Sequence, residues 1–212
     1  RRLFDISTAW IGWGMLALEI GELLLQLGRG MLATRDDDSL TSAQWFALRF
    51  FARANVFSRT LSGLAAYQAT TRGTASQTIK SLEQLGYLVR ERSPYDGRSS
   101  ILNVTEKARK RTAGDPLTSI FNDIDSLEAG KQEILRDTLR QLVGQLGTKS
   151  RRQAVGSCGD CIFLLVRRLK SQDDRVLTNF FCKCLGMPVA EKELGLICVS
   201  FQARSAAPAG GC

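Results

Sequence analysis

The residues with the clearest chemical potential are six cysteines, which all lie in the last 55 residues of the chain. In order they are Cys158, Cys161, Cys182, Cys184, Cys198 and Cys212. A secreted disulfide scaffold would spread its cysteines through the fold, whereas residues 1–157 contain none. A local cluster with a C-x2-C pair indicates instead a metal site or a redox switch in a reducing cytosol. We therefore expect a cytoplasmic protein.

The spacing of five of these cysteines predicts a four-thiolate metal site. A tight C-x2-C loop places two sulfurs on one ion or cluster, and cysteines further along the chain complete the tetrahedron. The predicted ligands are Cys158, Cys161, Cys184 and Cys198, with Cys182 as an alternative to Cys184. Cys212 is the least suited to bind metal, because it ends a tail rich in Gly, Pro and Ala.

Zinc and an iron–sulfur cluster both remain open as the occupant. Zinc is the commoner ion in four-cysteine sites. The second cysteine pair is not C-x2-C, however, and apolar residues such as Phe163, Phe180 and Leu185 flank the cysteines, which suits an iron–sulfur cluster. A cluster would make the protein a sensor of iron, oxygen or oxidants, and zinc would stabilise the extension. A thiol–disulfide switch without metal is the remaining alternative.

The chain contains no histidine, which limits the kinds of catalytic and metal sites that it can form. Ser-His-Asp and Cys-His catalysis are excluded, as are metal sites with imidazole ligands. A thiol redox enzyme would need Cys158 at a helix N-terminus within a thioredoxin-like strand pattern, which the sequence lacks. We therefore expect a protein that is not an enzyme.

Composition and charge favour a globular protein with an anionic partner. The 212 residues are 44% hydrophobic and 24% charged, and the net charge is +8. Residues 72–111 hold nine Lys or Arg and four Asp or Glu, so positive charge gathers in the centre of the chain. Nucleic acid is the first candidate for such a partner.

The same central segment predicts three helices followed by a β-hairpin. The first helix is expected to begin at Thr41 or Ser42, the second to span residues 60–67 and the third residues 74–85. The two strands are expected at residues 87–92 and 100–104. Gly86 fits a left-handed helix cap, and Pro94 with Asp96-Gly97 fits a polar turn between the strands. This order of elements is typical of a winged helix-turn-helix.

The third predicted helix has an outward face suited to DNA. Ala75, Ile79, Leu82 and Leu85 would be buried. The outward residues are Thr74, Ser76, Gln77, Thr78, Lys80 and Ser81. Short hydroxyl and amide side chains of this kind can enter a major groove and hydrogen-bond to base edges and phosphates. An interaction module that binds no DNA is the alternative for this segment.

The stretch SLEQLGYLVRERSPYDGRSSILNVTEKARK resembles MarR-type transcriptional regulators. The matching features are Leu85-Gly86-Tyr87-Leu88-Val89, the wing motif Asp96-x-Arg98, and Val104-Thr105-Glu106-Lys107. The resemblance covers roughly residues 6–147, with small departures at Val104 and Ala108. It does not extend to the cysteine-rich segment.

The resemblance implies a homodimer on a pseudo-palindromic operator in double-stranded DNA. Two recognition helices would lie in successive major grooves, Arg98 would enter the minor groove, and Asp96 would orient the wing. The implied DNA-binding residues are Arg72, Thr74, Ser76, Gln77, Thr78, Lys80, Ser81, Asp96, Arg98 and Ser99. The family often binds small-molecule effectors near its dimer base, and repression is its more common outcome.

The expected fold class is therefore mainly α (α+β), with a winged helix-turn-helix, a helical dimerisation base and a small cysteine-rich extension. The base would comprise residues 6–28, with an apolar helical stretch at 9–27, together with helices at 105–127, broken around 114–116, and at 129–146. Glu19 and Glu22 argue against a membrane span in the first of these helices. The expected domains are residues 1–147 and 148–212, with a polar linker at 147–152. Because the chain starts at Arg1 rather than Met, we expect further residues upstream.

Overall fold

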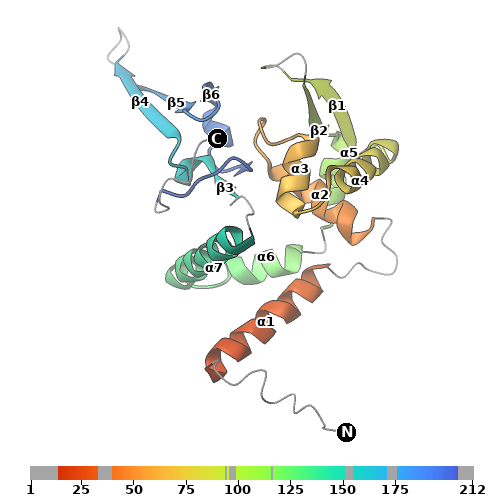
Figure 1. Cartoon of the computed structure of the whole chain (residues 1–212), viewed down its shortest axis with the longest axis vertical. Coiled ribbons are helices and arrows are strands. Elements are labelled where there is room, and N and C mark those ends of the chain that lie inside the picture. Colours follow the sequence, from red (N-terminus) through yellow and green to blue (C-terminus); the bar gives the residue numbers. More distant parts are fainter. Residues whose placement is uncertain are drawn as a thin grey trace. The chain divides into compact units, whose positions relative to one another are not determined.

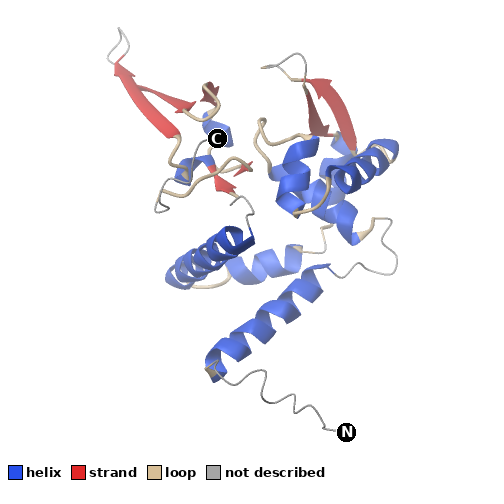
Figure 2. Cartoon of the chain, in the orientation of Figure 1, coloured by secondary structure: helices blue, strands red, loops and turns tan. Residues whose placement is uncertain are grey.

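The computed structural model describes residues 14–32, 40–93, 95, 99–115, 117–150, 155–170 and 176–204. Contacts divide the chain into two units, residues 1–42 and 43–212. Figures 1 and 2 show the helices and strands along the chain. The expected α+β class, with helices and small antiparallel sheets, is confirmed.

The first unit contains one described helix, α1 (Met15–Leu32). The prediction of a helix is confirmed over Met15 to Leu27, and the helix continues five residues further, whereas residues 9–13 lie outside the described part. Its large apolar side chains are exposed within the single chain, including Met15, Leu16, Ile20, Leu23, Leu24, Leu25 and Leu27. No helix in the described ranges is long and apolar enough to cross a membrane.

The core of the second unit lies among three helices. These are α2 (Ser42–Arg53), α3 (Leu61–Gln68) and α4 (Arg72–Gln84). Trp45, Phe50 and Phe51 of α2 are almost completely buried, as are Leu64 of α3 and Leu82 of α4. Burying each such side chain stabilises the fold by about 1.5–3 kcal/mol before entropy is counted. The predicted helical triplet is therefore confirmed.

Caps and glycines set the helix limits in this core. The Thr60 and Thr71 side chains accept hydrogen bonds from backbone N–H groups and begin α3 and α4. The Thr71 cap places the start of α4 two residues before the predicted Thr74, because Arg72 and Gly73 join the first turn. A Cβ at Gly63 would lie 2.1 Å from the Ser58 carbonyl oxygen, so α3 approaches the preceding turn closely. Gly86 has φ +72°, the predicted left-handed conformation after α4.

The wing is an antiparallel hairpin of β1 (Leu88–Arg92) and β2 (Ser100–Val104). Leu88 pairs with Val104, and Arg92 pairs with Ser100. Leu102 is fully buried and its N–H donates to the Arg59 carbonyl at 2.8 Å, which holds β2 against the turn before α3. The hairpin prediction is confirmed, with one residue trimmed from the first strand.

Three further helices follow the wing. They are α5 (Glu106–Thr112), α6 (Thr118–Asp125) and α7 (Ala129–Ser150). The predicted break between α5 and α6 is confirmed. The predicted linker is wrong over residues 147–150, because α7 continues through them. Gly147 does not end the helix, since a glycine inside a helix costs only about 1 kcal/mol, less than the hydrogen bonds of a helical turn contribute.

The cysteine-rich extension forms two small antiparallel sheets. One pairs β3 (Gly156–Ser157) with β7 (Ile197–Cys198), and the other orders β4 (Leu164–Lys170), β5 (Val176–Cys182) and β6 (Met187–Val189). After β6 the chain forms a single 3-10 turn, η3 (Glu191–Glu193), and Gly195 disfavours its continuation as a helix.

A bidentate ion pair joins α2 to the connection between α5 and α6. Arg49 Nε and Nη2 donate to Asp115 at 2.7 and 2.6 Å, and both side chains are mostly buried. Burial alone would raise the pKa of Asp115, but hydrogen bonds from Arg49 and from the Leu117 N–H outweigh it and hold that pKa below its ordinary value. The carboxylate therefore contributes stability in its ionised form.

Replacing Asp115 with Asn is expected to lower the free energy of unfolding by about 1–2 kcal/mol at pH 7, measured by urea denaturation. Because the folded pKa is below the unfolded value of about 3.9, this contribution is present above that pH and is lost as the pH falls through the folded pKa. The two proteins should therefore converge in acid. Asp137→Asn, in an exposed pair with Arg136, is the control and should change little. Equal effects of the two variants would contradict this role.

Candidate nucleic-acid interface and cysteine cluster

Helix α4 presents a polar face opposite its buried one. Ala75, Ile79 and Leu82 point into the core. At 100° per residue, Thr74, Gln77 and Lys80 lie on the opposite side, and the structure exposes all three. Arg72 is also exposed, in the first turn. The helix therefore offers amide, hydroxyl and cationic groups at helical spacing, as the sequence predicted.

Three of the predicted recognition residues are only partly exposed. Ser76 is half-buried, and the half-buried Thr78 hydroxyl donates to the Thr74 carbonyl at 3.3 Å. The Ser81 hydroxyl accepts a hydrogen bond from the Gln44 side chain at 2.7 Å, which joins α4 to α2. Ser81 therefore positions the helix, a role that its sequence position alone did not reveal.

The wing is joined to α4 by a residue that sequence reasoning missed. Arg90 of β1 pairs with Glu83 of α4 at 3.1 Å and donates to the Ser100 hydroxyl at 3.1 Å. Ser99 is exposed, and its carbonyl accepts from the Ser93 N–H. Asp96 and Arg98, the most specific part of the wing motif, lie outside the described residues.

The extension gathers three of its cysteines in one apolar cluster. Cys158 and Cys198 are buried with Val189, and Cys182 packs against them together with Phe57 and other partly buried residues. The Cys158 thiol donates to Cys198, which lowers the pKa of Cys198 and, with burial, raises the pKa of Cys158. The side-chain amide of Asn55 donates to Cys158 Sγ at 3.3 Å.

The other cysteines are placed differently. Cys161 is buried, and its N–H donates to the Cys158 carbonyl across η2 (Cys158–Asp160). Cys184 is disulfide-bonded and is not one of the free thiols, whereas Cys182 is free. Cys182, the alternative to Cys184 in the predicted set, is therefore the one of the two that packs with Cys158 and Cys198 as a free thiol. Cys212 lies outside the described residues. Within the described residues, no group of three or more His, Cys, Asp or Glu side chains is arranged to hold a metal ion.

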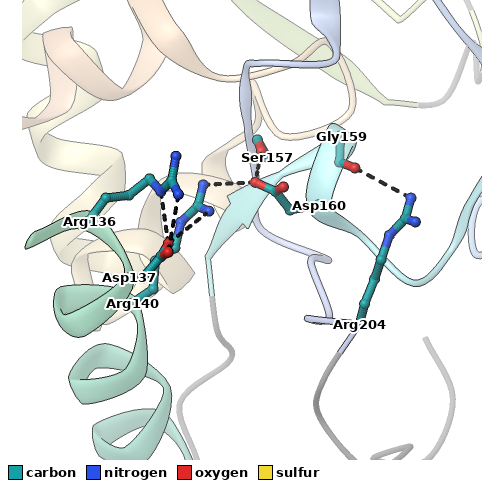
Figure 3. Close-up of polar contacts among 7 residues, drawn as sticks. All are labelled: Arg136, Asp137, Arg140, Ser157, Gly159, Asp160 and Arg204. Carbon is teal, nitrogen blue, oxygen red and sulfur yellow. Dashed lines mark hydrogen bonds and ion pairs between the residues drawn. The ribbon is translucent and has the colours of Figure 1, made fainter. Parts of the chain in front are cut away.

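Polar contacts hold the C-x2-C loop from both sides (Figure 3). Asp160 accepts from Arg140 of α7 at 2.7 Å and from the Ser157 hydroxyl at 2.9 Å. Arg204 Nη2 donates to the Gly159 carbonyl at 3.4 Å. Neither arginine was identified from the sequence, because contacts between distant segments leave no local pattern.

The α2–α3 turn, residues 54–60, contacts the extension along its length. Ala54 forms a bridge with Ile197, and the Asn55 N–H donates to the Ile197 carbonyl at 2.9 Å. The Ser58 hydroxyl accepts from the Val199 N–H at 3.1 Å. The extension therefore continues the hydrogen bonding of the helix-turn-helix itself.

The same turn also contacts the wing. Arg59 donates to Asn103 of β2 at 2.8 Å and to Glu193 of the extension at 3.2 Å. The ring centroids of Phe57 and Tyr95 are 5.1 Å apart, so the residue that packs on the cysteine cluster also touches the hairpin loop. The α2–α3 turn thus lies between the cysteines and the wing.

Among solved structures, the chain is similar to CouR from Rhodococcus jostii RHA1 bound to p-coumaroyl-CoA (18% identity, 61% of this chain and 95% of that chain, TM-score 0.48). It is also similar to a MarR transcriptional regulator from Methanosarcina mazei Go1 (23% identity, 62% of this chain and 97% of that chain, TM-score 0.44). A third similar structure is the S. aureus MepR–DNA complex (17% identity, 63% of this chain and 99% of that chain, TM-score 0.45). No curated protein matches the chain.

Residues 38–99 match the family model described as MarR family. The matched segment contains α2, α3, α4 and β1, and the other wing strand follows directly. The resemblance inferred from the sequence is thereby confirmed for this part of the chain. Its helices and hairpin form a winged helix-turn-helix, and residues 38–99 are similar to the MarR family.

Proposed function

We propose that the chain is a sequence-specific regulator of transcription that reads double-stranded DNA with α4. The observation that carries this proposal is the exposed polar face of α4, a helix whose opposite face is buried in the core. On the exposed face, the Thr74 and Gln77 side chains suit base edges, and Lys80 suits phosphate or guanine. Beside it lies an antiparallel wing, and the segment belongs to a family of regulators.

Charge around this face supports binding to a polyanion. Arg72, Arg92, Arg109 and Lys110 are exposed on α4, the wing and α5. Contacts between such cations and phosphates release counterions, so affinity for any duplex falls as salt rises. Asp96 and Arg98 remain proposed wing contacts, with Arg98 in the minor groove.

The regulator acts as a homodimer in this proposal. The exposed apolar side chains of α1 exceed what a surface helix needs, and α7 likewise exposes Ile134 and Val143. A second copy would cover such faces and would present two α4 helices to the half-sites of a pseudo-palindrome. A cytoplasmic repressor without enzymatic activity, sensitive to a small-molecule effector, completes the proposal.

The alternative is a winged helix that binds only protein. Exposed cations on three adjacent elements favour DNA over this alternative. Absence of duplex binding at low salt would favour the protein-binding alternative.

Variants of α4 test DNA reading. An operator is first selected from a random duplex library, and affinity is measured by fluorescence anisotropy at several salt concentrations. Gln77→Ala is expected to lose about 1–3 kcal/mol of discrimination at one base pair. Lys80→Ala is expected to weaken binding to every sequence and to reduce the salt slope by about one. Glu133→Gln, an exposed change on α7, is the control. Unchanged binding by both α4 variants would reject α4 as the reading helix.

Leu23→Glu tests the dimer. Leu23 is 51% exposed in the single chain, and a charge placed there within an apolar interface would be desolvated without a partner. We expect the wild type to sediment as a dimer and the variant as a monomer, with operator affinity reduced at least about tenfold because half-site contacts are no longer joined. Lys131→Glu adds negative charge at an exposed position of α7 and should stay dimeric. A monomeric wild type, or a dimeric Leu23→Glu with unchanged affinity, would disprove this role of α1.

A further inference from the structure

Strands β4 and β5 form a two-stranded ribbon that extends past the third strand of their sheet. Strand β6 pairs only with residues 180–182 of β5. The pairing of β4 with β5 continues beyond β6, from Arg167 opposite Asn179 to Lys170 opposite Val176. At about 3.3 Å per residue, this part is roughly 13 Å long. Residues 167–170 and 176–179 are called the ribbon below.

The cysteine cluster packs at the base of the ribbon and leaves the ribbon itself outside. Leu164 of β4 and Phe180 of β5 pack against the buried Cys158, Val189 and Cys198. Buried thiols behave there as small apolar side chains, so the cluster is the core of this sheet. In the ribbon, by contrast, the structure exposes Arg167, Arg168, Thr178 and Asn179.

Positive charge on the ribbon is not neutralised by neighbouring carboxylates. Arg167 and Arg168 are consecutive in a strand, so their side chains lie on opposite faces of the ribbon. The residues opposite them, Asn179 and Thr178, are uncharged. In the part of the chain that the structure describes, neither arginine has a carboxylate partner, whereas several other arginines of the second unit form ion pairs.

The extension as a whole is also basic. Residues 148–212 hold ten Lys or Arg and five Asp or Glu, so more than half of the net charge of +8 belongs to this segment. Its charge is therefore separate from that of α4, the wing and α5, on which the proposed function rests. A cationic surface of this kind suits an extended anionic partner.

We infer that the ribbon is a second DNA-binding surface, which contacts the phosphates of the duplex beside the half-site that α4 reads. This inference rests on the proposed function. A two-stranded β-ribbon has the dimensions of the major groove of B-DNA, and Arg, Thr and Asn side chains are common phosphate contacts. Such contacts position a protein on any sequence, so the ribbon would add affinity rather than specificity.

The α2–α3 turn contacts both the sheet of the ribbon and the wing. The Asn55 amide donates to Cys158 at the base of the ribbon, and Arg59 donates to Asn103 of β2. The sheet is therefore held to the helix-turn-helix, which the proposed function places on DNA. An anionic membrane is the other extended source of phosphate groups, and this attachment favours DNA.

Duplexes of two lengths test the ribbon. The full-length protein is mixed with the selected operator, either alone or extended by about ten base pairs, one helical turn, on each side. We expect the wild type to bind the extended duplex at least about tenfold more tightly at low salt, because the added phosphate contacts release counterions. Arg167→Ser/Arg168→Ser should lose this gain, and its salt slope on the extended duplex should fall by about two. Fluorescence anisotropy gives both quantities.

Two further variants separate the ribbon from overall charge. Lys131→Ser/Lys192→Ser removes the same charge at exposed positions on α7 and η3, and it should keep the gain from flanking DNA. Arg167→Lys/Arg168→Lys keeps the charge of the ribbon and should keep most of the gain. Circular dichroism and thermal unfolding check that each variant folds. Equal loss in the Lys131/Lys192 variant would assign the effect to overall charge and overturn the inference.

The outcomes distinguish this inference from the proposed function. A wild type that gains nothing from flanking DNA, or a ribbon variant that keeps the gain, would overturn the inference, while Gln77→Ala and Lys80→Ala still test α4. Loss of duplex binding in the ribbon variant, with no effect of the α4 variants, would support the ribbon and reject reading by α4. Absence of binding to any duplex at low salt would reject both.

Vesicles test the membrane alternative. The wild type and Arg167→Ser/Arg168→Ser are sedimented with vesicles of phosphatidylglycerol and phosphatidylcholine, and with vesicles of phosphatidylcholine alone. We expect the ribbon variant to differ from the wild type on extended DNA and not on either kind of vesicle. Binding to anionic vesicles that depends on the ribbon arginines, with unchanged duplex binding, would assign the ribbon to a membrane and overturn the inference.

Discussion

The buried side chain of Asn55 is the contact on which the arrangement of the second unit depends. Its carbonyl oxygen accepts from the Ser58 N–H at 2.9 Å, which shapes the α2–α3 turn, and its amide donates to Cys158 Sγ. The residue is completely buried, so either group left unpaired would cost about 1–3 kcal/mol. The side chain of Asn55 therefore makes one hydrogen bond within the α2–α3 turn and one to the cysteine cluster. Moving the turn away from the cluster would break one of these two bonds.

Several contacts of the second unit cross the domain boundary that the sequence predicts at residues 147–148. Helix α7 runs through the predicted linker, Arg140 on that helix pairs with Asp160, and Ile197 pairs with the α2–α3 turn. An extension with little core of its own gains stability by continuing the backbone hydrogen bonding of its neighbour.

The sequence predicted the elements whose signals are local and missed those that rest on distant pairing. Gly86 and the order of elements in the wing were readable because a cap or turn is specified within a few residues. Arg59 and Glu193 are separated by 134 positions, and no local periodicity marks such a pair. The packing of Cys182 against Cys158 and Cys198 likewise rests on distant pairing, because β4 pairs with β5 and places Cys182 opposite Leu164.

Helix α4 and the wing, the two DNA contacts of the proposed function, are held in physically different ways. Helix α4 is fixed by its own buried residues Ala75, Ile79 and Leu82. The wing is a two-stranded hairpin, which is marginal alone, and its contact with α4 through Arg90 is partly exposed. Phe57 and Arg59 therefore supply support that the wing lacks by itself. In the proposed function, a change in the extension would reach the DNA through the wing, because Phe57 and Arg59 contact the hairpin, whereas α4 keeps its own buried residues.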